Sequence, residues 1–132
     1  MAGYSGKPIV EKLGLKPGHR VYIERVPEGL PLEWPESVTV LRRPPAEPVD
    51  MVWAFCLDRR RLDQRLRTLV AKTAVAGSLW ISWPKNSSGV ATDLDENVVR
   101  EAGLDAGVVD VKVAAVDDVW SALKFVRRLA DR

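Results

Sequence analysis

A nearly unbroken apolar run in the middle of the chain constrains the fold more than any other feature. It spans residues 49–57 (VDMVWAFCL), and Asp50 is its only charged residue. A strand this apolar must be covered on both faces, as a central strand is in a parallel sheet flanked by helices. We therefore expect an α/β fold built around this strand.

The residues after this run alternate between helical and extended patterns. Asp58 stands where a helix N-cap would, leucines at 62, 66 and 69 follow helical spacing, and Gly77 is expected to close that helix. A strand follows over 78–83. Further extended and helical patterns of the same kind predict right-handed crossovers between parallel strands.

A second helix is expected to cover the same sheet. Thr92 or Asp93 would cap it, Glu96 would complete a capping box, and Gly103 would end it. An alternating strand follows over 108–116.

The beginning of the chain predicts a small helix and two strands. Tyr4 to Lys7 would form a loop, and Pro8 suits a first helical turn ahead of the apolar stripe of Ile9, Val10 and Leu13. Strands are expected over 20–26 and 38–42. The proline-bearing segment between them lies where such folds usually place a helix.

The end of the chain allows two interpretations. Residues 120–129 carry apolar side chains on both strand parities, but Leu123, Val126 and Leu129 also fit a helix. The short Asp117-Asp118 link favours a hairpin, so we expect an antiparallel edge strand paired with 108–116. Residues 1–132 would then form one Rossmann-like three-layer domain with a mostly parallel sheet of five to six strands.

Composition argues against several functional classes. Lys plus Arg number 20 and Asp plus Glu 18, a net charge of +2, so the overall field gives little attraction for nucleic acid. The longest apolar runs are too short to cross a bilayer, and the first residues do not resemble a signal peptide. Cys56 is the only cysteine, which suits a reducing cytoplasm and permits no internal disulfide.

Several segments resemble the core of class I S-adenosylmethionine (SAM)-dependent methyltransferases. The similarity is carried by 13–21 (LGLKPGHRV), 50–55, 76–81 (AGSLWI), 102–104 (AGL) and 108–113. This resemblance implies a Rossmann-like fold. It also implies a cofactor site at a glycine-rich turn after the first strand, with an acidic residue after the second strand to hold the ribose.

The chain departs from that pattern at the cofactor site. The turn after the first strand, 24–29 (ERVPEG), has one glycine, and Arg42-Arg43 stand where the acidic residue is expected. We therefore expect side chains and the Pro27 ring to obstruct the approach of a cofactor to the main chain. No bound cofactor is predicted.

A closer resemblance is to a family of small bacterial proteins of unknown function. It spans nearly the whole chain and is carried by 4–6 (YSG), 15–18 (LKPG), 83–85 (WPK), 92–94 (TDL), 109–112 (VDVK) and 117–121 (DDVWS). The resemblance implies no activity.

Ligands of open parallel sheets bind beyond the carboxyl ends of the strands. In this chain the segments expected at that edge are 25–28, 42–43, 56–61, 83–89 and 117–121. The loop 83–89 (WPKNSSG) is the leading candidate, since Lys85, Ser87 and Ser88 with Thr92 could hold a phosphate or carboxylate. Trp83, Asp117 and Trp120 would flank it. The alternative is a polar turn with no ligand.

No catalytic or metal-binding constellation stands out. His19 is expected at the edge opposite the cleft, and Cys56 suits a buried apolar site. Asp117-Asp118 lack further oxygen ligands for a cation. Arg59-Arg60-Arg61 suit a solvated helix start offset by Asp58 and Asp63.

The sequence therefore favours a binding domain over an enzyme. Its partner would be an anionic small molecule at the Lys85 loop or another protein. One alternative is a SAM-dependent methyltransferase-like enzyme with an atypical cofactor site. Another is a homo-oligomeric module that pairs through the expected edge strand near 120–128.

Overall fold

The computed structural model describes residues 9–132, so the loop predicted at Tyr4 to Lys7 and the helical turn predicted at Pro8 lie outside the described residues. Over that range the elements are α1 (Ile9–Lys12), β1 (Arg20–Glu24), β2 (Thr39–Leu41), β3 (Val49–Phe55), α2 (Arg59–Ala71), β4 (Thr73–Pro84), η1 (Asn86–Ser88), α3 (Glu96–Asp105), β5 (Val108–Ala115), β6 (Trp120–Arg127) and η2 (Leu129–Asp131).

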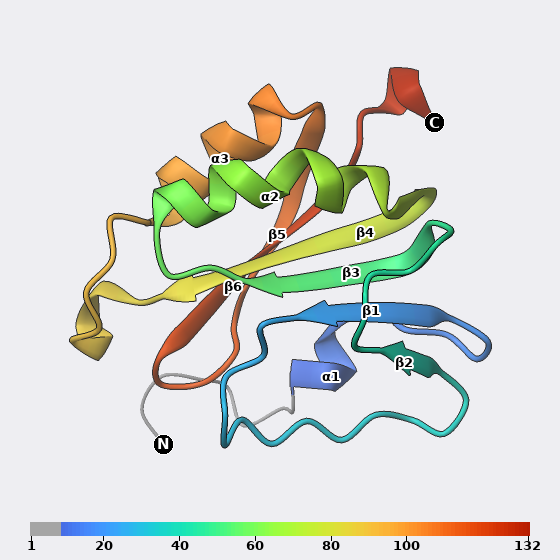
Figure 1. Ribbon diagram of the computed structural model, residues 1–132, viewed down its shortest axis with the longest axis horizontal. Helices are drawn as coiled ribbons and strands as arrows, with labels where there is room; N and C mark the ends of the chain where they lie inside the picture. The colour runs from blue at the N-terminus through green and yellow to red at the C-terminus, as the bar shows by residue number, and fades with distance from the viewer. Residues whose placement is uncertain (1–8) are drawn as a thin grey trace.

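The described strands form one six-stranded sheet in the order β2-β1-β3-β4-β6-β5. The first four strands in this order are mutually parallel, and β6 runs antiparallel to both β4 and β5. Figure 1 shows α2 and α3 over one face of the sheet and α1 on the other. The predicted Rossmann-like α/β class with a mostly parallel sheet is confirmed.

The apolar run at 49–57 occupies the central position that its composition predicts. Its strand, β3, pairs with β1 on one side and β4 on the other. Six of its seven residues are buried, Asp50 being half-buried. Both faces of the strand are therefore covered, which is why polar alternation is absent from its sequence.

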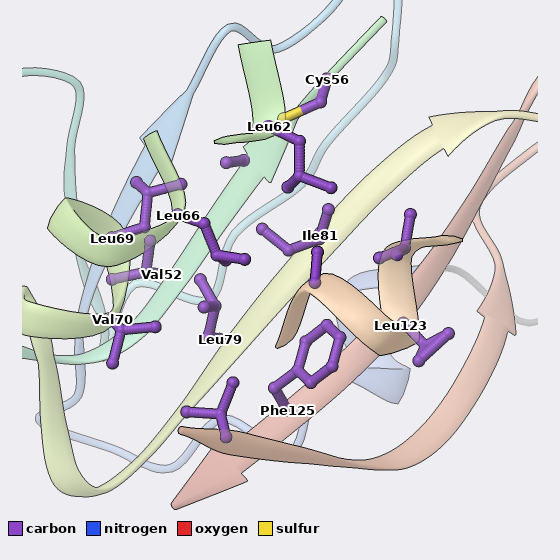
Figure 2. Packing of buried hydrophobic residues seen from close by; sticks show 14 of the residues in the cluster. Val52, Cys56, Leu62, Leu66, Leu69, Val70, Leu79, Ile81, Leu123 and Phe125 are labelled. Carbon is purple, nitrogen blue, oxygen red and sulfur yellow. The ribbon is translucent and has the colours of Figure 1, made fainter. Parts of the chain in front are cut away.

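The core is divided between the two faces of the sheet. On the face under α2 and α3, leucines of α2 meet β3 and β4 while Phe125 and Leu123 of β6 extend the packing (Figure 2). On the other face, Trp53 and Trp80 are fully buried beneath α1 and the irregular segment after β1. Among the described residues, no helix is long and apolar enough to cross a membrane.

The last strand is internal to the sheet rather than at its edge. The expected antiparallel pairing of 120–129 with the preceding strand is confirmed, but β6 also pairs with β4, from Leu79↔Phe125 to Pro84↔Trp120. The expectation of an edge strand near 120–128 was therefore wrong, and β5 is the edge. Apolar residues on both parities of β6 are the reason, because each face of this strand is packed.

Gly77 does not end a helix as expected. The helix α2 ends at Ala71, and Gly77 lies inside β4, where the register against β3 shifts between Val49 and Met51. A Cβ on Gly77 would stand 2.5 Å from the Asp50 carbonyl oxygen. The glycine is required by close approach of two backbones at an irregularity in the pairing, a common reason for glycine in a strand.

Gly103 likewise lies inside α3, which continues to Asp105. A Cβ there would stand 2.2 Å from the Phe125 ring, so the glycine lets the helix lie close over β6. The expected cap at Thr92 or Asp93 was also wrong. The Asp95 side chain accepts the Val98 N–H at the start of α3, while Asp93 accepts the Arg59 N–H of α2.

Candidate functional site

A cavity of about 360 Å³ opens at the carboxyl ends of β1 and β3. This size falls in the range of small-molecule sites. Its lining comes from three stretches of chain: the turn after β1, the end of β3 with the start of α2, and the start of β6. The lining residues are Arg25, Pro27, Phe55, Leu57, Asp58, Arg61 and Trp120.

The turn after β1 leaves the space beyond the sheet open. Arg25 has a left-handed backbone, with φ at 57°, and the chain from there to β2 contains no helix. Pro27 forms one wall of the cavity instead of filling it. The expected obstruction is therefore incomplete. The lack of a glycine-rich turn stands, and a non-glycine residue in this conformation carries strain of the kind found at functional sites.

A buried carboxylate anchors the arginines beside the cavity. Glu24, at the end of β1, accepts hydrogen bonds from Arg65 at 2.6 and 3.1 Å and from the Tyr22 hydroxyl at 2.8 Å. Burial alone would raise the pKa of Glu24, but the hydrogen bonds from Arg65 and Tyr22 outweigh it and lower that pKa. Glu24 is therefore ionised at neutral pH and is a weak base.

Arg61 joins this network at longer range and forms part of the cavity wall. Its nearest guanidinium nitrogen lies 3.6 Å from Glu24 Oε2. Its Nε is buried and has no hydrogen-bond partner in the described part of the chain. An unsatisfied buried donor is uncommon, and this one belongs to a side chain that also lines the cavity. The wall can therefore supply charge-assisted hydrogen bonds to an anion.

Two aromatic rings also line the cavity. Phe55 and Trp120 meet edge to face, with ring centroids 5.2 Å apart, and Trp53 lies 4.9 Å behind Phe55. Trp34 adds a further edge contact to Trp53 at 6.3 Å. Phe55 is buried and Trp120 is half-buried, so the rings offer a fixed apolar surface to a planar ligand.

The Tyr22 hydroxyl provides a pH-dependent test of this network. Burial and the hydrogen bond to Glu24 raise the pKa of Tyr22 from 10.0 to about 12. Because the pKa is higher in the folded protein, Tyr22 stabilises the fold below pH 10, and this stabilisation is lost as the pH rises toward 12. The free energy of unfolding should fall by roughly 2 kcal/mol over that range. Tyr22→Phe should remove this part of the alkaline decline in urea-unfolding free energy.

Cys56 also contributes to the alkaline pH dependence of the unfolding free energy. Burial raises its pKa from 9.0 to about 12, so it contributes a decline over an overlapping pH range in both proteins. At pH 7, loss of the hydrogen bond in Tyr22→Phe should cost about 1 kcal/mol. An unchanged slope between pH 10 and 12 would contradict the assignment to Tyr22.

The polar groups of the predicted Lys85 loop form hydrogen bonds with other parts of the protein and within the loop. Lys85 Nζ donates to the Asp117 carbonyl at 2.6 Å, and its backbone N–H donates to Val119 at 2.7 Å. The Ser88 hydroxyl donates to the Lys85 carbonyl, and the Thr92 hydroxyl donates to Leu57. The loop thus ties β4 to the turn before β6.

The remaining predicted site residues are distributed between core and cavity. Trp83 is buried in the core under α2 and α3, and Ser87 is exposed. The Asp117 carboxylate accepts the Val119 and Trp120 N–H groups. Of the predicted set, Trp120 lines the carboxyl-edge cavity. An anion site at the Lys85 loop stays a prediction.

The other residues singled out in the sequence have structural roles. His19 accepts the Lys16 N–H at the amino end of β1, away from the cavity. Cys56 is buried, with a raised pKa that keeps it a thiol. Asp58 caps α2 as predicted, and Arg59 pairs with Asp63. Within residues 9–132, no three His, Cys, Asp or Glu side chains cluster as metal ligands.

Sequence reasoning located the edge of the sheet but not the set of side chains. Segments 25–28, 56–61 and 117–121 were expected there, and all three contribute to the cavity. It missed Phe55 as a wall residue because the apolar run gave no sign of where the strand ends. It also missed the Glu24 network, although an acidic residue ending an apolar strand is a signal for a paired buried charge.

Comparison with solved proteins finds structural similarity to SAM-dependent methyltransferases. The chain aligns with a SAM-dependent methyltransferase from Aquifex aeolicus at a TM-score of 0.60 and 17% identity, covering 89% of this chain and 86% of that one. A TehB-like SAM-dependent methyltransferase from Corynebacterium glutamicum gives 0.60 and 8%, with 91% and 86% covered.

A longer neighbour is the magnesium protoporphyrin IX methyltransferase from Synechocystis PCC 6803 with bound SAH. It aligns at a TM-score of 0.54 and 14% identity over 70% of this chain, which spans about half (52%) of that protein. At these identities the likeness shows the fold alone. No protein-family model matches the sequence, and neither does any curated protein.

The distant resemblance to the methyltransferase core is thus confirmed at the level of the fold. The chain has a Rossmann-like methyltransferase fold, with its antiparallel strands at one side of the sheet. The closer resemblance to small bacterial proteins of unknown function stays a prediction.

Proposed function

We propose that this protein is a binding domain for a small molecule that combines a planar ring with an anionic group. The observation that carries the proposal is the carboxyl-edge cavity, whose lining combines arginine and aromatic side chains. Parallel sheets bind ligands at this edge. A nucleoside monophosphate is the simplest ligand of this chemistry.

The ligand chemistry follows from the two walls. Arg25 and Arg61 line the cavity and supply the cations. Phe55 and Trp120 supply the surface for a ring. Asp58 already accepts the Arg61 N–H through one oxygen, which leaves acceptor capacity for a ligand hydroxyl.

Binding without catalysis is supported by the state of the titratable groups around the cavity. Glu24 has a lowered pKa and is committed to Arg65, while the pKa values of Tyr22 and Cys56 are raised to about 12. A general base at neutral pH needs a pKa close to 7. A reducing cytoplasm is the location that a single buried thiol favours.

The test is isothermal titration of the protein with a panel of nucleotides and phosphorylated metabolites. We expect saturable heat with a ligand that carries both ring and anion, and weaker binding to inorganic phosphate. Arg25→Ala should weaken that binding about tenfold, because one charge-assisted hydrogen bond is lost. The backbone strain at this position is nearly the same for both residues.

Arg60→Ala is the matched control. Arg60, like Arg25, is an exposed arginine. It lies at the start of α2 and does not line the cavity. The proposal fails if no member of the panel binds, or if Arg25→Ala and Arg60→Ala weaken binding equally.

A second candidate function is that of a SAM-dependent methyltransferase-like enzyme with an atypical cofactor contact. It is favoured by the structural neighbours, several of which were solved with bound SAM or SAH. Including SAM and SAH in the same panel separates the candidates. Saturable binding of both, lost in Arg25→Ala, with no binding of nucleoside monophosphates, would replace the first proposal with this one.

A further inference from the structure

A second cavity, of about 400 Å³, lies at the opposite end of the central strands. It is lined by Asp50 and Met51 at the start of β3, by the first half of β4, and by 13–16 with His19 from the chain between α1 and β1. Met51 and Phe55 mark the two sites and are four residues apart on β3, about 13 Å along the strand. The two cavities are therefore separate.

Part of the lining of this cavity comes from residues 13–16, which do not line the carboxyl-edge cavity. Residues 13–16 begin the LGLKPG segment. Gly14 has a left-handed backbone, and a Cβ there would lie 3.9 Å from Lys124 Nζ. The glycine turn after α1 thus lies beside the lysine of β6, and Lys16 lines the same cavity.

Basic groups outnumber acidic ones in this lining. Lys16, Lys124 and the imidazole of His19 face a single carboxylate, Asp50, one oxygen of which accepts the Arg20 N–H at 2.8 Å. Within residues 9–132, Lys124 pairs with no carboxylate, and its Nζ lies 6.0 Å from the centre of the Trp80 ring. His19 Nδ1 accepts the Lys16 N–H, so the proton of a neutral ring is on Nε2, which can donate.

Leu13, Met51 and Val126 give the same cavity an apolar floor. We propose that it is a second ligand site, for a small organic anion whose carboxylate or phosphate is held by Lys16 and Lys124 while its apolar body packs on this floor. The charge-assisted contacts orient the anionic group, and the floor favours an anion with an apolar body over a fully hydrated inorganic ion.

The test is a titration of ¹⁵N-labelled protein with phenyl phosphate, hexanoate and inorganic phosphate, followed by amide chemical shifts. Phenyl phosphate or hexanoate should shift the amides of Gly14, Gly77 and Ser78 saturably, and inorganic phosphate should do so at higher concentration. The comparison of the first two distinguishes a phosphate from a carboxylate ligand. Lys124→Met, which keeps the apolar stem, should weaken binding about tenfold.

Lys112→Met is the control, since Lys112 lies on the adjacent strand and donates to the Lys12 carbonyl outside the cavity lining. If Lys124→Met does not fold, Lys16→Met replaces it, because Lys16 is exposed. Absence of saturable shifts, shifts confined to Leu57 and Trp120, or equal effects of Lys124→Met and Lys112→Met would each overturn the proposal. Arg25→Ala should leave this binding unchanged, so failure here is distinct from failure of the proposed function.

Discussion

Glu24→Ala should lower the free energy of unfolding by about 3 kcal/mol at pH 7. The substitution leaves Arg65 and the Tyr22 hydroxyl without their common acceptor, and Arg61 without its nearest anion. Loss of one partner of a buried pair costs 3–5 kcal/mol. The lower end applies because Arg61 and Arg65 keep between a fifth and a third of their side-chain surface in contact with water.

The pH dependence of Glu24→Ala supplies an internal check. The pKa of Glu24 is lowered in the folded protein, so its stabilising effect is present above the pKa of the unfolded chain and is lost as the pH falls through the folded value. The difference between wild type and variant should therefore shrink in acid. Urea unfolding at pH 7 and pH 3 measures it, and a difference that does not shrink contradicts the ionised state of Glu24.

Asp63→Ala provides the matched surface comparison. Asp63 pairs with Arg59, and both side chains are about half exposed. An exposed pair of this kind contributes less than about 1 kcal/mol. Equal losses in Asp63→Ala and Glu24→Ala would show that the buried network has no special energetic role.

Trp53→Ala should be the more damaging substitution, lowering the unfolding free energy by about 4–5 kcal/mol. Trp53 is fully buried at the centre of β3 and stacks on Phe55. Its indole N–H also donates to Ser82 Oγ at 2.7 Å, so the substitution leaves a buried hydroxyl without its donor as well as a cavity. Denaturant unfolding followed by circular dichroism measures the loss.

Trp34→Ala is the contrast for Trp53→Ala. Trp34 touches the same ring from the irregular segment after β1 but is only half-buried. Its removal should cost about 1–2 kcal/mol, in proportion to the smaller area it removes from water. A loss as large as that of Trp53→Ala would mean that the covering segment, rather than the strand, determines stability on this face.

The central part of the fold could be predicted because its signals are local. The apolar run of β3 and the cap at Asp58 each follow from a few adjacent residues. The errors concerned contacts between distant segments. Gly77 and Gly103 resemble helix ends in sequence, but each is a glycine because another part of the chain, Asp50 or Phe125, comes too close for a side chain.

The same limit applies to the candidate site. Five segments were expected at the carboxyl edge. The sequence does not tell whether the polar side chains of such a segment bond to other parts of the protein, as in the Lys85 loop, or line a cavity, because the direction of each side chain is not encoded locally. Lys85 donates to the Asp117 carbonyl, while Arg61, the last of an ordinary-looking run of three arginines, reaches Glu24. The space beside Pro27 depends on the left-handed turn at Arg25, which nothing in the sequence of that turn requires.

The absence of a helix between β1 and β2 bears on how the cavity could respond to a ligand. The backbone of this connection is fixed at a few points, such as Leu30 to Pro27 and Val38 to Pro35. We expect a segment held so sparsely to open locally, at a free energy well below that of global unfolding, and its amides to exchange faster for that reason. The Pro27 side of the cavity should then be compliant, whereas Phe55 is fixed in β3. A ligand that orders the compliant side would bind with an entropic penalty.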